Sequence, residues 1–304
     1  MGVFRFFYSS ARTHEMAKNA LAALRKKTGY TFANCRKALE MHNNDPAKAE
    51  DWLREQAKAL GWNAAMKVQS RRATQGLIGV AINNKKVAMV ELNCETDFVS
   101  RNEKFKEMVD LVTSVCLKYP VLNPGEDTKE VNLNAEELAK LKIGNETLAD
   151  HMAVLISGIG ENMLLRRAYC YETQRNDINL AVSVHPPCSN SSVLHGKYAA
   201  FIVYQRNASN GEDTDGVSNE ICKHIIGMNP TKIGDYETDE PCKNASEEPA
   251  LIHQEFLSDE SKTVGDFLKE SGIKLLTFQR FECGEEEANK TSNESNEKET
   301  EAKT

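Results

Sequence analysis

The chain has 304 residues, 40% of them hydrophobic, and a formal net charge of −7. This length is enough for two or three domains, and the mildly acidic balance argues against a general DNA-binding protein. No stretch approaches the roughly 20 consecutive apolar residues that a membrane-spanning helix requires.

Residues 1–15 have the composition of a targeting segment. The segment from Met1 to His14 contains two arginines, two serines and several aromatic residues, and Glu15 is the first acid. Because Arg5 interrupts a very short apolar part, a secretory signal is disfavoured. We predict a mitochondrial transit peptide here and a mature chain in the mitochondrial matrix. The alternative is a disordered start with no targeting role.

Residues 16–62 are predicted to form three short helices. The second helix begins at Thr31, a good N-cap, and the third begins with Asp45 as N-cap and Pro46 at the first helical position. We expect Gly61 to end the third helix. Helices this short are marginal alone and must pack on one another, so the segment is predicted to be a compact three-helix module.

Two strands and a helix are predicted next. Gly76–Ile82 and Lys85–Asn93 are apolar runs separated by Asn83-Asn84, a pair that accepts positive φ in a turn. A helix is expected at about 102–119, with apolar residues at steps of three and four. Ser100 and Glu103 have capping-box spacing for this helix.

Asp97 and Phe98 are therefore expected at a strand-to-helix corner. One interpretation is a core phenylalanine beside an acid that favours the helix dipole. The other is an exposed aromatic anchor for a partner protein, with a polar neighbour that orients it. Periodicity alone leaves both open.

The first half continues with short helices at about 135–141 and 146–159. The second half repeats the plan, with strand-like runs at 169–173, 178–185 and 195–204 and a helix at about 216–227. Because a strand hairpin followed by a helix occurs twice, we predict an α+β fold: a three-helix module and then two α+β subdomains with small antiparallel sheets. Residues 228–260 are polar and proline-bearing and are expected to form loops, and a final helix and strand lie at 263–268 and 275–281.

The predicted domain boundaries follow from these elements. They are a transit peptide at 1–15, a three-helix domain at 16–62, core subdomains at 63–165 and 166–284, and a disordered acidic tail at 285–304. Residues 11–72 carry 13 Lys and Arg against 6 Asp and Glu, whereas the tail carries 7 acids against 3 lysines. The basic front is either a set of solvated helix faces or a docking face.

The sequence contains no recognisable catalytic constellation. Its seven histidines show no metal-binding helix spacing, no serine lies in a Gly-x-Ser-x-Gly elbow, and there is no P-loop. The eight cysteines show no metal-knuckle or redox spacing and are expected to be small buried side chains. We therefore predict no catalytic residue, no metal, no cofactor and no direct nucleotide binding.

Several motifs resemble the elongation factor Ts family, in its mitochondrial form. The most specific is Asn93-Cys94-Glu95-Thr96-Asp97-Phe98-Val99. Others are Leu24–Gly29, Asn34–Leu39, Ala49–Arg54, Ile159–Asn162, His195-Gly196 and the closing segment, so the resemblance extends over nearly the whole chain.

The resemblance implies a ubiquitin-associated-like front module and a guanine-nucleotide exchange factor for mitochondrial elongation factor Tu, without bond chemistry of its own. The factor would bind the nucleotide-free or GDP-bound G domain and promote GDP release by disturbing the Mg²⁺/nucleotide site. No contact with DNA or a membrane is implied. The residues that match the family's partner contacts are Thr96, Asp97, Phe98, Val99, Phe32, Ala33, His195 and Gly196. A ubiquitin-binding or RNA-binding module in translation, without exchange activity, is the alternative.

Overall fold

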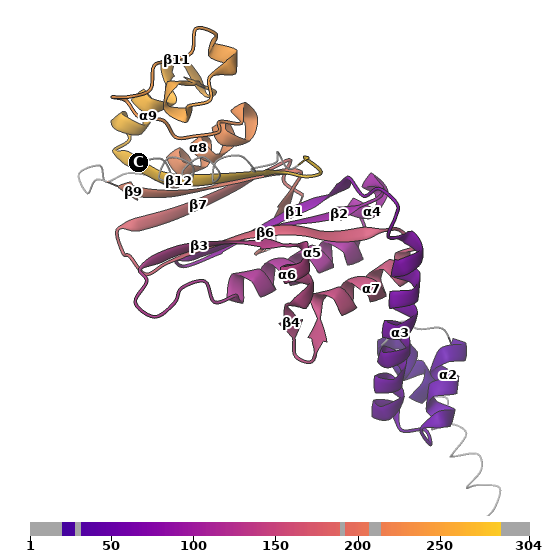
Figure 1. Cartoon of the computed structure of the whole chain (residues 1–304). Helices are drawn as coiled ribbons and strands as arrows, with labels where there is room; N and C mark the ends of the chain where they lie inside the picture. Colours follow the sequence, from indigo (N-terminus) through magenta and orange to yellow (C-terminus); the bar gives the residue numbers. More distant parts are fainter. Residues whose placement is uncertain (1–19, 28–31, 189–191, 207–213, 287–304) are drawn as a thin grey trace, which may run out of the picture. The chain divides into compact units, whose positions relative to one another are not determined.

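The computed structural model describes residues 20–27, 32–188, 192–206 and 214–286 (Figure 1). The predicted transit peptide and most of the predicted tail lie outside these residues. Packing divides the chain into two units, of which the first contains the described residues up to Arg71 together with Ala139–Met163. The second contains Arg72–Leu138 and the described residues from Leu164 onward. The predicted domain boundaries follow the sequence pattern and stay a prediction.

The first unit begins with the predicted helical module. Residues 20–27 are helical, and α2 (Phe32–Met41) and α3 (Pro46–Val68) follow. Asp45 caps α3 as predicted, because its side chain accepts the backbone N–H groups of Ala47 and Lys48. The buried side chains of the module are Leu24, Cys35, Ala38, Leu39, Ala49 and Leu53.

The prediction that Gly61 ends the third helix is wrong, because α3 continues to Val68. A Cβ atom at Gly61 would lie 2.7 Å from the backbone carbonyl of Ala153, on helix α7 (Leu148–Ile159). The missing side chain thus allows a close crossing of two helices. Packing outweighs the roughly 1 kcal/mol by which glycine disfavours a helix interior, and no sequence pattern within α3 shows this.

The remainder of the first unit leads into and out of α7. A small hairpin pairs β4 (Lys142–Ile143) with β5 (Glu146–Thr147). Thr147 and Asp150 form a complete capping box at the start of α7. Gly160, in the left-handed conformation, ends the helix.

The second unit contains a five-stranded sheet in the order β3-β6-β2-β1-β8. Its strands are β1 (Gln75–Asn83), β2 (Lys86–Cys94), β3 (Thr128–Asn134), β6 (Met163–Thr173) and β8 (Leu194–Gly196). Strand β3, which leads into α6 (Ala135–Lys140), was not predicted, because it is a largely exposed strand whose main buried residue is Leu133. Helix α5 (Glu103–Lys118) packs against β1 and β2.

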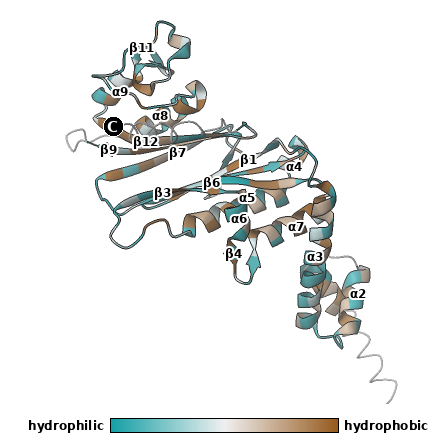
Figure 2. Ribbon diagram, viewed as in Figure 1, coloured by the Kyte–Doolittle hydropathy of each residue, from teal (hydrophilic) through white to brown (hydrophobic). Residues whose placement is uncertain are grey.

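A three-stranded antiparallel sheet lies against the first sheet (Figure 1). Its strands are β7 (Ile178–His185), β9 (Tyr198–Arg206) and β12 (Ile273–Glu282). Side chains of both sheets, among them Ile78, Met89, Tyr169 and Phe201, form one buried cluster. In Figure 2 hydrophobic colours gather on β7 and β9, as expected for strands enclosed between layers.

The other face of the three-stranded sheet is covered by α8 (Thr214–Met228) and α9 (Val264–Glu270). Between them lie only short elements: η1 (Ala245–Glu247), η2 (Leu251–His253), β10 (Glu255–Phe256) and β11 (Asp259–Thr263). The predicted α+β class is confirmed. Among the described residues, no helix combines the length and apolar character needed to cross a membrane.

Candidate protein-binding site at the strand-to-helix corner

The corner after β2 contains a separate short helix, α4 (Asp97–Ser100). Thr96 is extended and caps α4 by accepting the backbone N–H of Val99 at 3.4 Å. The predicted capping box of Ser100 and Glu103 is wrong: Ser100 is buried and donates to the carbonyl of Asp97 at 2.8 Å, and Asn102 is the N-cap of α5. Helices α4 and α5 therefore begin separately, each with its own N-cap, whereas the periodicity predicted a single helix start.

Phe98 projects from this corner with 79% of its surface exposed, the highest value among the large hydrophobic side chains that the structure describes. Its neighbours Val99 and Ser100 are buried. Burying a phenylalanine contributes about 1.5–3 kcal/mol, so the fold leaves this contribution available. The structure therefore favours the exposed-anchor interpretation of the corner over the core interpretation.

Asp97 precedes Phe98 in the chain, and its side chain is half-exposed. Its carboxylate pairs with the Arg101 guanidinium at 2.9 Å. An exposed pair of this kind contributes about 1 kcal/mol or less, so the carboxylate can exchange Arg101 for a donor on a partner at small cost. Below it, Cys94 is fully buried and its Sγ contacts the Thr96 carbonyl at 3.2 Å, which fixes the start of the corner.

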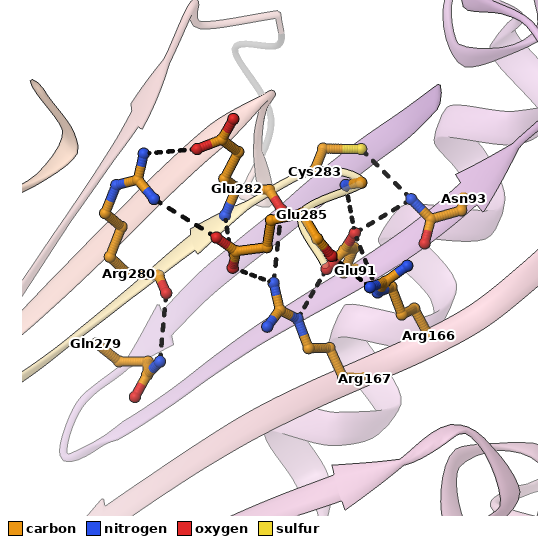
Figure 3. A network of polar contacts seen from close by, with 10 residues as sticks. Glu91, Asn93, Arg166, Arg167, Gln279, Arg280, Glu282, Cys283 and Glu285 are labelled. Carbon is orange, nitrogen blue, oxygen red and sulfur yellow. Dashed lines mark hydrogen bonds and ion pairs between the residues drawn. The ribbon is translucent and has the colours of Figure 1, made fainter. Parts of the chain in front are cut away.

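A buried carboxylate holds the end of β2 in place (Figure 3). Glu91 is 0% exposed and accepts the Arg167 Nε–H of β6 at 2.7 Å. Its other oxygen accepts the Gly284 backbone N–H at 2.7 Å and the Asn93 amide at 3.1 Å. Because each oxygen has a donor and the charge has a partner, this buried acid is compensated. It joins β2 to β6 and to the segment after β12.

The segment after β12 fits closely against this carboxylate. Gly284 has φ +84°, and a Cβ atom here would overlap the carbonyl oxygen of Thr74, so only glycine suits the position. Glu285 pairs with Arg167, and Arg280 lies 3.7 Å from Glu285. The end of the fold is thus fastened beside the start of β1.

Asn93 and Cys283 show why part of the corner motif is structural. Asn93 is fully buried and its amide also contacts the Gln75 carbonyl at 3.3 Å and the Cys283 sulfur at 3.6 Å. Burial, reinforced by the charge of Glu91, raises the pKa of the Cys283 thiol to about 12. The thiol is therefore neutral at physiological pH and unsuited to nucleophilic chemistry.

The predicted contact residues His195 and Gly196 lie inside the second unit, on β8. His195 is 2% exposed, and its Nε2 is 2.7 Å from the Asp110 carboxylate on α5. It lies opposite Gly79 in the β1–β8 register. A Cβ at Gly196 would come within 2.8 Å of the Tyr198 carbonyl oxygen. Neither residue presents a surface for docking in this structure.

The other predicted contact residues are divided between the units. Thr96, Asp97, Phe98 and Val99 are contiguous at the corner. Ala33 is exposed near the start of α2, in the first unit, and the Phe32 side chain lies outside the described part. Within the residues that the structure describes, no group of three His, Cys, Asp or Glu side chains is arranged to hold a metal ion.

The network around Glu91 was missed from the sequence. A signal existed, since Glu91 is an isolated acid within the apolar run of β2 and Arg166-Arg167 is a basic pair in β6. A charge within a buried strand requires a partner of opposite charge. The sequence does not say which of the chain's 38 basic residues supplies it.

Comparisons with known proteins agree with this arrangement. A family model described as "Elongation factor Ts, mitochondrial, N-terminal" matches residues 4–63, and one described as "Elongation factor TS" matches residues 95–248. A protein of Aedes aegypti is 47% identical over 276 residues, covering 88% of each chain. One of Drosophila melanogaster is 47% identical over 288 residues, covering 92% of this chain and 90% of its own.

A mouse protein is 35% identical over 281 residues, which cover 89% of this chain and 85% of the relative. All three relatives carry the name "Elongation factor Ts, mitochondrial". The chain belongs to the elongation factor Ts family, as its motifs predicted.

Members of this family are guanine-nucleotide exchange factors for elongation factor Tu, and this is the function of the chain. It is of the mitochondrial form and acts in the mitochondrial matrix. The predicted function and location are thereby confirmed, and the ubiquitin-binding or RNA-binding alternative is set aside.

Proposed function

We propose that Phe98 enters the G domain of elongation factor Tu and that Asp97 orients it there. The observation that carries the proposal is the exposure of the Phe98 ring, 79%, on a corner whose next two residues are buried. A large apolar side chain that is exposed beside buried residues has the character of an interface anchor. Thr96 supports it by capping α4, and Val99 supports it by burial.

Exchange requires that the factor bind the nucleotide-free partner better than the loaded one. This coupling is reciprocal, so bound nucleotide weakens the factor as much as the factor weakens the nucleotide. Burial of one phenylalanine, about 1.5–3 kcal/mol, corresponds to roughly a tenfold to hundredfold change in affinity. The ring can therefore supply a substantial part of the coupling if it is buried only in the nucleotide-free complex.

The factor makes and breaks no bond in this mechanism. Elongation factor Tu holds the nucleotide and its Mg²⁺, and the chain acts by displacing side chains beside that site. Neither DNA nor a membrane has a part in it. In the first unit, Phe32 and Ala33 are proposed to contribute a second contact with the G domain, which adds area without taking part in displacement. His195 and Gly196 are proposed to act as framework, because both are buried on β8.

The test is the Phe98→Ala variant, assayed by release of mant-GDP from purified elongation factor Tu. Because the ring is exposed, the free energy of unfolding should change by less than about 0.5 kcal/mol. The maximal rate of stimulated release should fall at least roughly tenfold.

Leu257→Ala is a matched control, since Leu257 is also a large exposed side chain, at 54%, but lies on the β10–β11 turn. It should stimulate release as the unmodified chain does. Wild-type stimulation by Phe98→Ala, or an equal loss in both variants, would defeat the proposal.

A further inference from the structure

A cluster of polar contacts around the buried carboxylate of Asp150 lies where α3 crosses α7 in the first unit. The Asp150 side chain is 11% exposed and lies 2.7 Å from the Lys58 ammonium. It accepts the Trp62 Nε1–H at 3.1 Å and the Thr147 backbone N–H at 3.0 Å. Burial alone would raise the pKa of Asp150, but the hydrogen bonds from Lys58, Thr147 and Trp62 outweigh it and lower the pKa. The carboxylate is therefore ionised at neutral pH.

Helix α3 belongs to two packing groups at once. Its first half supplies Ala49 and Leu53 to the core of the three-helix module. Its second half supplies Lys58, Gly61 and Trp62 to the crossing with α7. The helix has 23 residues, a length of about 34 Å without interruption. The module is therefore joined to α7 by a shared helix instead of a flexible linker.

The far end of α3 is fastened as well. Asn162, which is 2% exposed, donates from its side chain to the carbonyls of Gln69 and Arg71, at 3.4 and 2.7 Å. These carbonyls lie just beyond the end of the helix, where acceptors lack helical partners. The segment after α7 thus holds the exit of α3, while Asp150 holds its middle.

We propose that Lys58, Trp62 and Asp150 form a joint that fixes the direction in which the three-helix module is presented to elongation factor Tu. These are positioning residues: the carboxylate and the indole N–H face each other within the first unit. The inference rests on the proposed second contact made by the module. Its contribution is pre-organisation, because a module held in its binding direction loses less freedom when it docks.

The joint predicts a separation between affinity and maximal rate. If the module swings freely, its effective concentration at its docking position falls, and more factor is required to reach half of the maximal stimulation. Once the complex is saturated, Phe98 acts as before. A defect in the joint should therefore raise the half-saturating concentration, whereas a defect at Phe98 lowers the maximal rate.

The experiment measures mant-GDP release against the concentration of the full chain, for Lys58→Met, Lys58→Arg and Asp150→Asn. Lys58→Met and Asp150→Asn should raise the half-saturating concentration by roughly fivefold to tenfold and leave the maximal rate within about twofold. Lys58→Arg keeps the positive charge beside Asp150, so this variant should retain most of the affinity of the unmodified chain. Because the Lys58 side chain is about one-third exposed, its variants keep the test available if Asp150→Asn fails to fold.

Arg54→Met is the matched control, because Arg54 is a cation one turn earlier on α3 whose charge contacts Glu50 at 3.8 Å. It removes the same charge and leaves the joint intact, so its half-saturating concentration should stay within about twofold of the unmodified chain. An increase in Arg54→Met equal to that in Lys58→Met would show that charge alone matters and would overturn the joint.

Trp62 supplies a readout of the joint itself. The chain has two tryptophans, so Trp52→Phe leaves Trp62 as the sole indole emitter. In this background Lys58→Met and Asp150→Asn should shift the emission as the indole N–H changes partner. A shifted emission with unchanged half-saturation would overturn the proposal. If Phe98→Ala keeps full activity while the joint variants lose affinity, the proposed role of Phe98 fails and the proposed joint stands.

Discussion

The corner at residues 96–99 and the short strand β8 differ in how they present their motif residues. Both segments match the family, and both were expected to contact the partner. The corner directs Phe98 outward, whereas β8 encloses His195 beside Asp110 of α5. A motif match therefore indicates that a residue matters without saying whether it touches the partner or holds the frame. We propose that exposure of the side chain distinguishes the two cases.

The largest expected effect is a loss of stability at Glu91, the buried carboxylate on β2, the strand that leads into the corner. Glu91→Ala removes the buried one of the two carboxylates that pair with Arg167 and leaves the Gly284 N–H without its acceptor. Breaking a buried, hydrogen-bonded ion pair costs about 3–5 kcal/mol, so the free energy of unfolding should fall by that amount in urea denaturation.

The exposed Arg175–Asp177 pair, on the turn before β7, is the control, because solvent screens it and Asp177→Ala should lower the free energy of unfolding far less than Glu91→Ala. If Glu91→Ala and Asp177→Ala lower the free energy of unfolding equally, buried and exposed ion pairs do not differ in their contribution to stability, contrary to this prediction.

An intermediate effect is expected at β8. His195→Ala deletes a buried ring that lies opposite Gly79 and leaves Asp110 without its partner. The cavity and the lost hydrogen bond together should lower the free energy of unfolding by about 2 kcal/mol. At a temperature where the variant is folded, its maximal rate of mant-GDP release should equal that of the unmodified chain.

The contrast with Phe98→Ala is direct, because that variant should lose rate and keep stability. If His195→Ala has wild-type stability and a reduced maximal rate of release, His195 contacts the partner and is not a framework residue.

The smallest effect is a pH dependence within the frame. His224 is fully buried, its Nδ1 accepts the Leu257 N–H at 3.1 Å, and its Nε2 lies 2.9 Å from the Gln254 side-chain oxygen. Desolvation lowers the pKa of His224 below its ordinary value of 6.5. The unfolded chain thus binds this proton more tightly, and the free energy of unfolding should fall as pH decreases below about 6.5.

The measurement is urea denaturation between pH 7.5 and pH 5, two values chosen to bracket about 6.5, the ordinary pKa of histidine. His224→Gln removes the titrating group, so its stability should fall less steeply over this interval. Identical slopes in both proteins would show that His224 is not the source.

Local signals in the sequence predicted much of the fold. Asp45 and Pro46 start α3 as expected, because a cap is formed by residues next to one another. Gly61 was misjudged because its reason lies in Ala153, far along the chain. Strand β3 was missed because its side chains are mostly exposed.

The site shows the same division. The corner and the outward option for Phe98 followed from a strand end, a helix start and a family motif. The partners of Glu91 did not, because Arg167 and Gly284 lie 76 and 193 residues further along. No periodicity connects positions that distant, and the same is true of His195 and Asp110, which are 85 residues apart.

Gly284 has a consequence for the order in which the molecule is made. One of the N–H groups that donate to Glu91 belongs to Gly284, which lies close to the end of the described part of the chain. In a nascent or partly imported polypeptide that ends before residue 284, the Glu91 carboxylate lacks this hydrogen-bond donor. The hydrogen bonds of Glu91 are therefore complete only after residue 284 has been delivered.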